Sequence, residues 1–193
     1  MYTRIVLFMV LVVLATVQYA HDRGRIKYNI RILSGREIVI AAVISFTLMY
    51  AFSALTGILE SGYHFVDDHD LIGIRNYLSS HSFSESLMYF FKRDLTIRFR
   101  PTYYLIRVIQ TAVFGTDYKA WHLMYVVIAA LCFLLPYVYA RLNKCPVWLS
   151  YIFTVIIYVG GGQSPALWRL GPQEAFGMIL LTITLILLHI DHK

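Results

Sequence analysis

The residues best suited to chemistry in this sequence form three short polar groups, each placed just outside a long apolar run. The groups are Asp67-Asp68-His69-Asp70, Arg98 with Arg100, and Trp168-Arg169 with Glu174. Neighbouring carboxylates repel one another unless a cation compensates, so the first group suits a general base or the ligands of a divalent metal ion, Mg²⁺ or Mn²⁺. Arginines suit a phosphate, which a guanidinium binds through two parallel hydrogen bonds. Together the groups predict a site that receives a lipid phosphate from a membrane and activates a nucleophile above it.

Each polar group also has a plainer interpretation. An acidic run such as 67–70 is often a solvated turn, arginines at a membrane surface often anchor to lipid headgroups, and a tryptophan there often belongs to the aromatic belt. His64, His69 and His81 would add metal ligands only if the loop conformation brought them to the aspartates, and nothing in their spacing requires it.

The composition indicates the environment of these groups. Of the 193 residues, 59% are hydrophobic and 15% are charged, against roughly 25% charged in ordinary soluble domains. The charge-free apolar runs are 5–20, 38–58, 123–140, 175–190 and the shorter 147–159. A spanning helix needs about 20 mostly apolar residues. We therefore predict an all-α, multi-pass integral membrane protein with about five transmembrane helices, located in the cell (inner or plasma) membrane.

The basic residues predict how the chain is oriented. A net charge of +6 would suggest nucleic acid binding in a soluble protein, but basic residues of a membrane protein gather in cytoplasmic loops, so no nucleic acid partner is expected. The basic residues in the first two short loops are Arg23, Arg25, Lys27, Arg31, Arg36, Arg141 and Lys144. We therefore expect 21–37 and 141–146 inside, and the N-terminus, the long loop 59–121 and the loop 160–172 outside.

The first apolar run is either a signal peptide or a retained helix. Ala20 is small, but Gln18 fits poorly to a small-x-small cleavage site, so a retained helix is expected. The chain then divides into 1–37, an extra transmembrane helix with a basic cytoplasmic loop, and 38–193, a transmembrane module with the outward loop 59–121.

The outward loop carries signals for short amphipathic helices. Its first apolar residues at helical spacing are Leu71, Ile74 and Leu78. This spacing predicts a helix that lies in the membrane interface. Ser82 and Glu85 fit a capping box, which predicts a second helix over 83–92. Thr116 or Asp117 is placed to cap the spanning helix that follows.

A third helix is predicted between Pro101 and Gly115, since proline suits a helix start and glycine a stop. The stretch 102–114 is too short to span comfortably, so we expect it at the outer membrane surface or dipping partly in. Arg107 and Gln110 interrupt its apolar sequence. Either they require a partner subunit, or Arg107 extends to the headgroups.

Three segments resemble the GT-C glycosyltransferases, a family of membrane enzymes. They are Arg100-Pro101-Thr102-Tyr103-Tyr104-Leu105 with Phe114-Gly115 after it, Arg141-Leu142 at the end of a span, and Trp168-Arg169-Leu170-Gly171-Pro172-Gln173-Glu174. Their order, after a spanning helix and an acidic pair in a long first outward loop, is similar to that of the family. The resemblance runs from about residue 38 to the end of the sequence.

The resemblance implies an inverting glycosyltransferase that moves a sugar from a polyprenyl-phosphate donor to an acceptor on the outward face, as in the synthesis of cell-envelope glycans. It implies that Asp67 or Asp68 acts as catalytic base or metal ligand. The arginines expected at the donor phosphate are Arg98, Arg100 and Arg169. The residues expected to line the site or contact the acceptor are His69, Tyr103, Trp168 and Glu174.

The sequence departs from the family pattern in two ways. The helix over 5–20 is an extra one, and the chain ends after the counterpart of the family's fourth helix. The chain is therefore expected to bind membrane lipid and to work with a second membrane subunit or as a homo-oligomer. The alternative, from a different class of protein, is a non-catalytic membrane subunit or a truncated remnant that binds lipid or a partner protein.

Overall fold

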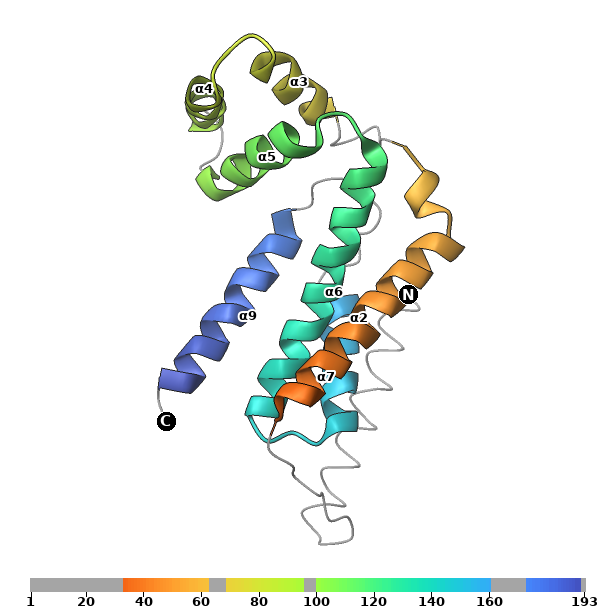
Figure 1. Ribbon diagram of the computed structural model, residues 1–193. Coiled ribbons are helices and arrows are strands. Elements are labelled where there is room, and N and C mark those ends of the chain that lie inside the picture. Colours follow the sequence, from red (N-terminus) through yellow and green to blue (C-terminus); the bar gives the residue numbers. More distant parts are fainter. Residues whose placement is uncertain (1–32, 63–68, 96–99, 161–172, 192–193) are drawn as a thin grey trace, which may run out of the picture. The chain divides into compact units, whose positions relative to one another are not determined.

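The computed structural model describes residues 33–62, 69–95, 100–160 and 173–191 (Figure 1). All regular secondary structure in these ranges is helical. The elements are α2 (Gly35–Leu55), the 3-10 turn η1 (Ile58–Glu60), α3 (His69–Leu78), α4 (Phe83–Leu95), α5 (Pro101–Phe114), α6 (Tyr118–Leu142), α7 (Val147–Gly160) and α9 (Gln173–Asp191). The prediction of an all-α protein is confirmed for this part of the chain.

The chain divides into two compact units. The first unit contains α2 up to Met49, α6 from Ile128 onward, α7, and α9 from Glu174. The second unit contains the end of α2 from Tyr50, then η1, α3, α4, α5 and the first part of α6 up to Val127. The two units are described separately below.

Two helices, α2 and α6, are long and apolar enough to cross a bilayer. They correspond to the predicted runs 38–58 and 123–140. The apolar parts of α7 and α9, Val147–Tyr158 and Glu174–Ile190, are shorter. The predicted span 5–20 lies outside the described residues. Within the described residues, the structure thus provides two helices of spanning length where the sequence predicted four spans.

Buried serine and threonine hydroxyl groups of the first unit donate to their own helices. Ser45 donates to the carbonyl of Ala41 at 2.7 Å, and Thr182 donates to that of Met178 at 2.8 Å. Exposed Thr184 of α9 does the same, donating to Leu180 at 2.9 Å. Such bonds satisfy polar groups without water, as an apolar surrounding requires.

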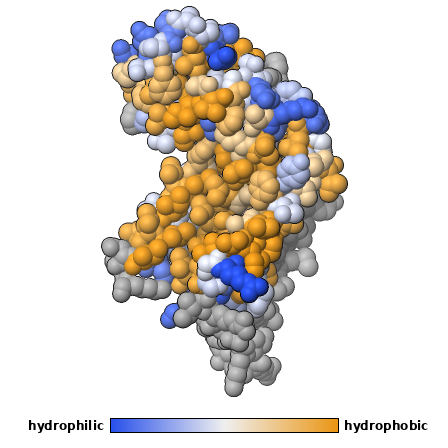
Figure 2. Space-filling model, viewed as in Figure 1, coloured by the Kyte–Doolittle hydropathy of each residue, from blue (hydrophilic) through white to orange (hydrophobic). Residues whose placement is uncertain are grey.

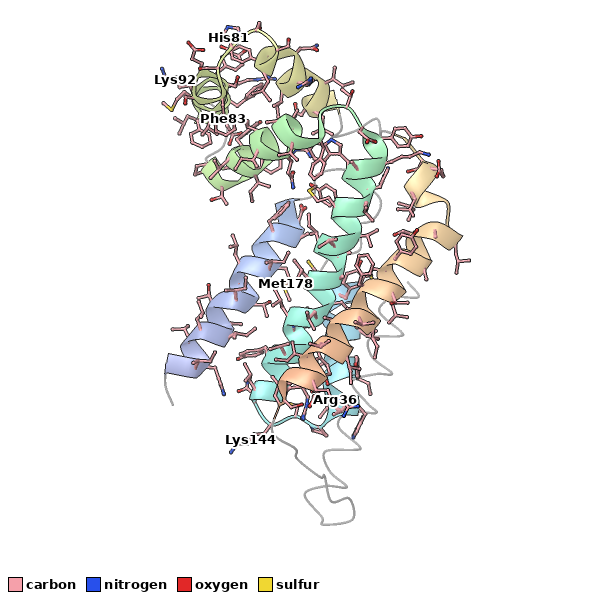
Figure 3. The ribbon with its side chains drawn as sticks, in the orientation of Figure 1. Arg36, His81, Phe83, Lys92, Lys144 and Met178 are labelled. Atoms are coloured by element: carbon pink, nitrogen blue, oxygen red, sulfur yellow. The ribbon has the colours of Figure 1, made fainter. Side chains whose placement is uncertain are left out.

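An ion pair joins the start of α2 to the end of α6 within the first unit. The carboxylate of Glu37 accepts from Nε of Arg141 at 2.5 Å and from the hydroxyl of Tyr137 at 2.6 Å. Arg141 is fully buried and also donates to the carbonyl of Cys145. Figure 3 shows Arg36 and Lys144 at this same end of the unit.

The second unit packs α3, α4 and α5 around one apolar core. Its fully buried members are Ile74 of α3, Phe90 of α4, and Tyr104 and Val108 of α5. The partly buried residues around them are Tyr77, Leu78, Leu87, Phe91 and Tyr103. Phe90 and Tyr104 stack with ring centroids 5.9 Å apart. Burial of these side chains stabilises three helices that are each too short to be stable alone.

Local sequence signals set the bounds of these helices as predicted. Glu85 accepts the backbone N–H of Ser82 at 2.9 Å and returns its own N–H to the Ser82 hydroxyl at 3.3 Å, which is the predicted capping box at the start of α4. The Ser82 hydroxyl, at 2.7 Å, and the Ser82 backbone N–H both donate to the Glu85 carboxylate and lower its pKa. Pro101 is the first residue of α5, and Gly115, with φ of 55°, ends it. Asp117 caps α6 by accepting the N–H groups of the third and second residues after it, Ala120 and Lys119.

Candidate functional site

The predicted site residues fall into three classes. Those outside the described residues are Asp67, Asp68, Arg98, Trp168 and Arg169. Glu174 is exposed and lies in the first turn of α9, in the first unit. His69 is the first residue of α3 in the second unit. Arg100 and Tyr103 are described in full and lie together at the start of α5.

Asp94 holds Arg100 through both its side chain and its backbone. Nη2 of Arg100 lies 2.7 Å from Oδ1 of Asp94, and Nε lies 3.3 Å from Oδ2. The backbone N–H of Arg100 also donates to Oδ2, at 2.9 Å. The Asp94 side chain is only 6% exposed, whereas that of Arg100 is 27% exposed. A buried carboxylate thus fixes a guanidinium that still reaches the surface, directly before α5.

Two tyrosines support the same guanidinium. Cζ of Arg100 lies 4.9 Å from the centre of the Tyr103 ring and 5.6 Å from that of Tyr104. Both distances are within the range of cation–π attraction. The hydrogen bond to Asp94 raises the pKa of Arg100. Burial raises the pKa of Tyr104, and the negative charges of Asp70 and Asp94 raise it further. Arg100 therefore stays cationic and Tyr104 stays neutral.

Arg107 lies deeper in the same unit. It is 1% exposed, and its Cζ lies 5.3 Å from the Trp121 ring and 5.8 Å from the Tyr103 ring. Gln110 is 6% exposed, and its Nε2 lies 3.4 Å from the sulfur of Met124 on α6. The sequence suggested a partner subunit or extension to the headgroups. Within the described residues, α6 contacts both side chains, through Trp121 and Met124.

The last described residues before the acidic segment, Ser61 and Gly62, are fixed to α6. Nε2 of His122, which is 3% exposed, lies 3.0 Å from the carbonyl oxygen of Gly62 and 3.3 Å from the hydroxyl of Ser61. Because a carbonyl oxygen only accepts, Nε2 carries the proton. An exposed ion pair, Lys119 with Glu60 at 3.1 Å, joins the same two elements. Residue 62, five positions before Asp67, is therefore held against α6.

The candidate metal ligands Asp67 and Asp68 lie outside the described residues. Within those ranges, no group of three or more His, Cys, Asp or Glu side chains is arranged to hold a metal ion.

Three residues of this site were not predicted from the sequence: Asp94, Trp121 and His122. Asp94 is the one with a sequence signal, because it is an acid six positions before an arginine that precedes a helix-starting proline. Trp121 and His122 belong to a spanning-length helix, where aromatic residues are ordinary packing residues. Their contacts become visible only once α6 meets α5 and η1.

Comparison with protein-family models, with curated proteins and with solved structures gives no match.

Proposed function

We propose that this chain is part of a membrane glycosyltransferase that moves a sugar from a polyprenyl-phosphate donor to an acceptor on the outward face. The observation that carries the proposal is the fixed guanidinium of Arg100 at the start of α5. Asp94 and the two tyrosine rings limit the conformations of this side chain, so that it loses little entropy on binding a phosphate. The start of a helix adds a positive dipole end to the same position.

The proposed reaction is a single displacement at the sugar. The acceptor hydroxyl oxygen attacks the anomeric carbon, the bond to the lipid phosphate breaks, and the phosphate leaves with its electron pair. Asp67 or Asp68 takes the hydroxyl proton, and the other organises the loop by hydrogen bonding. Arg98, Arg100 and Arg169 are the proposed cations for the leaving phosphate. The proposed lining residues are His69, Tyr103, Trp168 and Glu174.

The position of the acidic pair is supported by the anchor at Gly62. His122 holds that residue to α6, and a chain of five residues reaches at most about 18 Å from such an anchor. The proposed multi-pass location in a cell membrane is supported by the two helices of spanning length, α2 and α6.

Donor binding by the protein in lipid nanodiscs, with a panel of polyprenyl-phosphate sugars, tests the proposal. The guanidinium fork is geometric, so Arg100→Lys should lose donor binding nearly as completely as Arg100→Ala. The control is Lys92→Ala, which removes an exposed cation of α4 and should bind donor normally. Failure of the unmodified protein to bind any donor would overturn the proposal, and full binding by Arg100→Lys would reduce Arg100 to a headgroup anchor.

Turnover tests the chemical step. If the chain is active with its proposed second subunit, replacing the base, Asp67 or Asp68, with Asn should cost on the order of 10²-fold or more in rate. Near-full activity of both Asn variants would make the acidic pair a solvated turn. Activity of the purified monomer by itself would refute the need for a second chain.

A second candidate function is a non-catalytic membrane subunit that binds lipid or a partner protein. The specific observation in its favour is the ion pair itself, because Asp94 already offsets the charge of Arg100 inside the chain. In that case Arg100→Ala would lower the thermal stability of the protein. Polyprenyl-phosphate donors would bind neither the unmodified protein nor this variant.

A further inference from the structure

The polarity of α5 is the reverse of that of a surface helix in water. Three of its five buried residues are polar: Arg107, Gln110 and Thr111 are 1%, 6% and 0% exposed, beside the core residues Tyr104 and Val108. Helices that face water bury apolar residues and expose polar ones. These three polar residues of α5 are therefore covered by their own unit. The environment of the exposed face of α5 remains to be assigned.

The outward face of α5 is aliphatic. Leu105, Ile109 and Val113 are 38%, 44% and 69% exposed and recur every four residues, so they form one stripe along the helix. Thr102 and Ala112 are the other exposed residues of α5. No charged side chain interrupts this face. Figure 2 shows hydrophilic residues on the top of this unit, over α3 and α4, and apolar residues below them along α5.

We propose that the stripe formed by Leu105, Ile109 and Val113 is inserted into the hydrocarbon of the bilayer. The helix then lies along the membrane surface with Arg107 and Gln110 turned toward the protein. The inference rests on the membrane location proposed above and not on the transfer of a sugar.

The covalent connection places α5 near the bilayer. Only residues 115–117 separate its last residue from the first residue of α6, which is one of the two helices of spanning length. At most about 14 Å can therefore separate the two helix ends. With 14 residues, α5 is about 21 Å long, less than the roughly 30 Å of hydrocarbon that a spanning helix must cross. A helix of this length beside a span lies in the interface, where an aliphatic stripe is buried.

Lipid is a better-matched neighbour for this face than a protein partner. In the proposed location, lipid chains surround the stripe before any partner binds. A second copy or another subunit would have to displace lipid from a face that is uniformly aliphatic, with only Thr102 exposed on it as a hydrogen-bonding side chain. Specific protein interfaces have polar rims and hydrogen bonds, for which this face offers few groups.

Quenching of single fluorescent labels tests the proposal. Labels are placed by Ile109→Cys and Val113→Cys, in a background where Cys132 and Cys145 are replaced by Ala, and the protein is reconstituted in nanodiscs. Brominated acyl chains should quench both labels strongly, and aqueous iodide should quench them weakly. These sites are exposed in the chain, and thermal unfolding of each labelled variant verifies that it is folded.

Two matched labels separate the possible failures. Asn76→Cys, on the exposed polar side of α3, should show the opposite ratio of quenching by iodide and by brominated lipid. Val43→Cys, on α2 and 60% exposed, should be quenched by brominated lipid. If Val43→Cys is quenched by lipid while the α5 labels are quenched by iodide, α5 faces water and the inference is wrong. If neither quencher reaches the α5 labels, a protein covers the stripe and the inference is equally wrong. If Val43→Cys also escapes the lipid quencher, the membrane location itself fails.

Discussion

Removal of the Asp94 carboxylate is the sharpest test of the site at the start of α5. Asp94 accepts three N–H groups of Arg100, from the backbone N, Nε and Nη2. Breaking a buried ion pair by removing one partner costs about 3–5 kcal/mol. Because the Arg100 side chain is 27% exposed, its guanidinium regains part of its hydration. We therefore expect Asp94→Ala to lower the free energy of unfolding by about 2–3 kcal/mol.

A double-mutant cycle measures the interaction itself. Arg100→Met keeps an apolar stem of similar reach and removes the charge. Titration with a denaturing detergent in mixed micelles gives the free energy of unfolding for the two single variants and the double variant. A coupling energy of about 1–2 kcal/mol is expected for groups in direct contact. The control Lys92→Met, at an exposed position of α4, should change stability by less than about 0.5 kcal/mol.

The cycle also has a clear negative outcome. A coupling energy within about 0.3–0.5 kcal/mol of zero is ordinary additivity, and it would mean that Asp94 and Arg100 do not interact in solution. The account of a fixed guanidinium at the start of α5 would then be wrong, whatever the donor-binding results.

Three further predictions concern the frame of the two units. Gly115→Ala should destabilise the protein by about 1–3 kcal/mol in thermal unfolding, because the φ of 55° strains any residue with a side chain. The control Gly73→Ala, in open space on α3, should be neutral or stabilising. Glu85→Gln should lower thermal stability at neutral pH. Because the pKa of Glu85 is lowered in the folded protein, the difference in stability from the unmodified protein should fade as the pH falls through that lowered pKa. A constant difference in stability down to acid pH would contradict this. Arg141→Lys should destabilise the first unit measurably in the same assay, since lysine cannot reproduce the fork that contacts both oxygens of Glu37; an unchanged unfolding midpoint would refute that role.

The helices of the second unit could be predicted from the sequence because their signals are local. A capping box at Ser82 and Glu85, a proline at 101 and a glycine at 115 each act within a few residues, and the structure places helix ends at all of them. Apolar runs predicted α2 and α6 in the same way, since span length is a property of the run itself.

The contacts of the site could not be predicted, because they depend on residues that are distant in sequence or out of helical phase. Asp94 in the last turn of α4 meets Arg100 directly before α5, and His122 meets Gly62 from 60 positions away. Arg107 gave two expectations from its sequence context, and both assumed that α5 stood alone. In the structure Arg107 lies beside Trp121 of α6, and a single sequence carries no signal for such a contact.

The ion pair between Glu37 and Arg141 imposes an order of events during synthesis. The two residues are 104 positions apart, so at about 5–20 residues per second the ribosome needs roughly 5–20 s to make Arg141 after Glu37. Throughout that delay the guanidinium of Arg141 is not available to the carboxylate, which lies in the first turn of α2. The hydroxyls of Ser45 and Thr182 instead bond to carbonyls of their own helices and wait for no distant residue. The contact between the start of α2 and the end of α6 is therefore one of the last that the first unit can form.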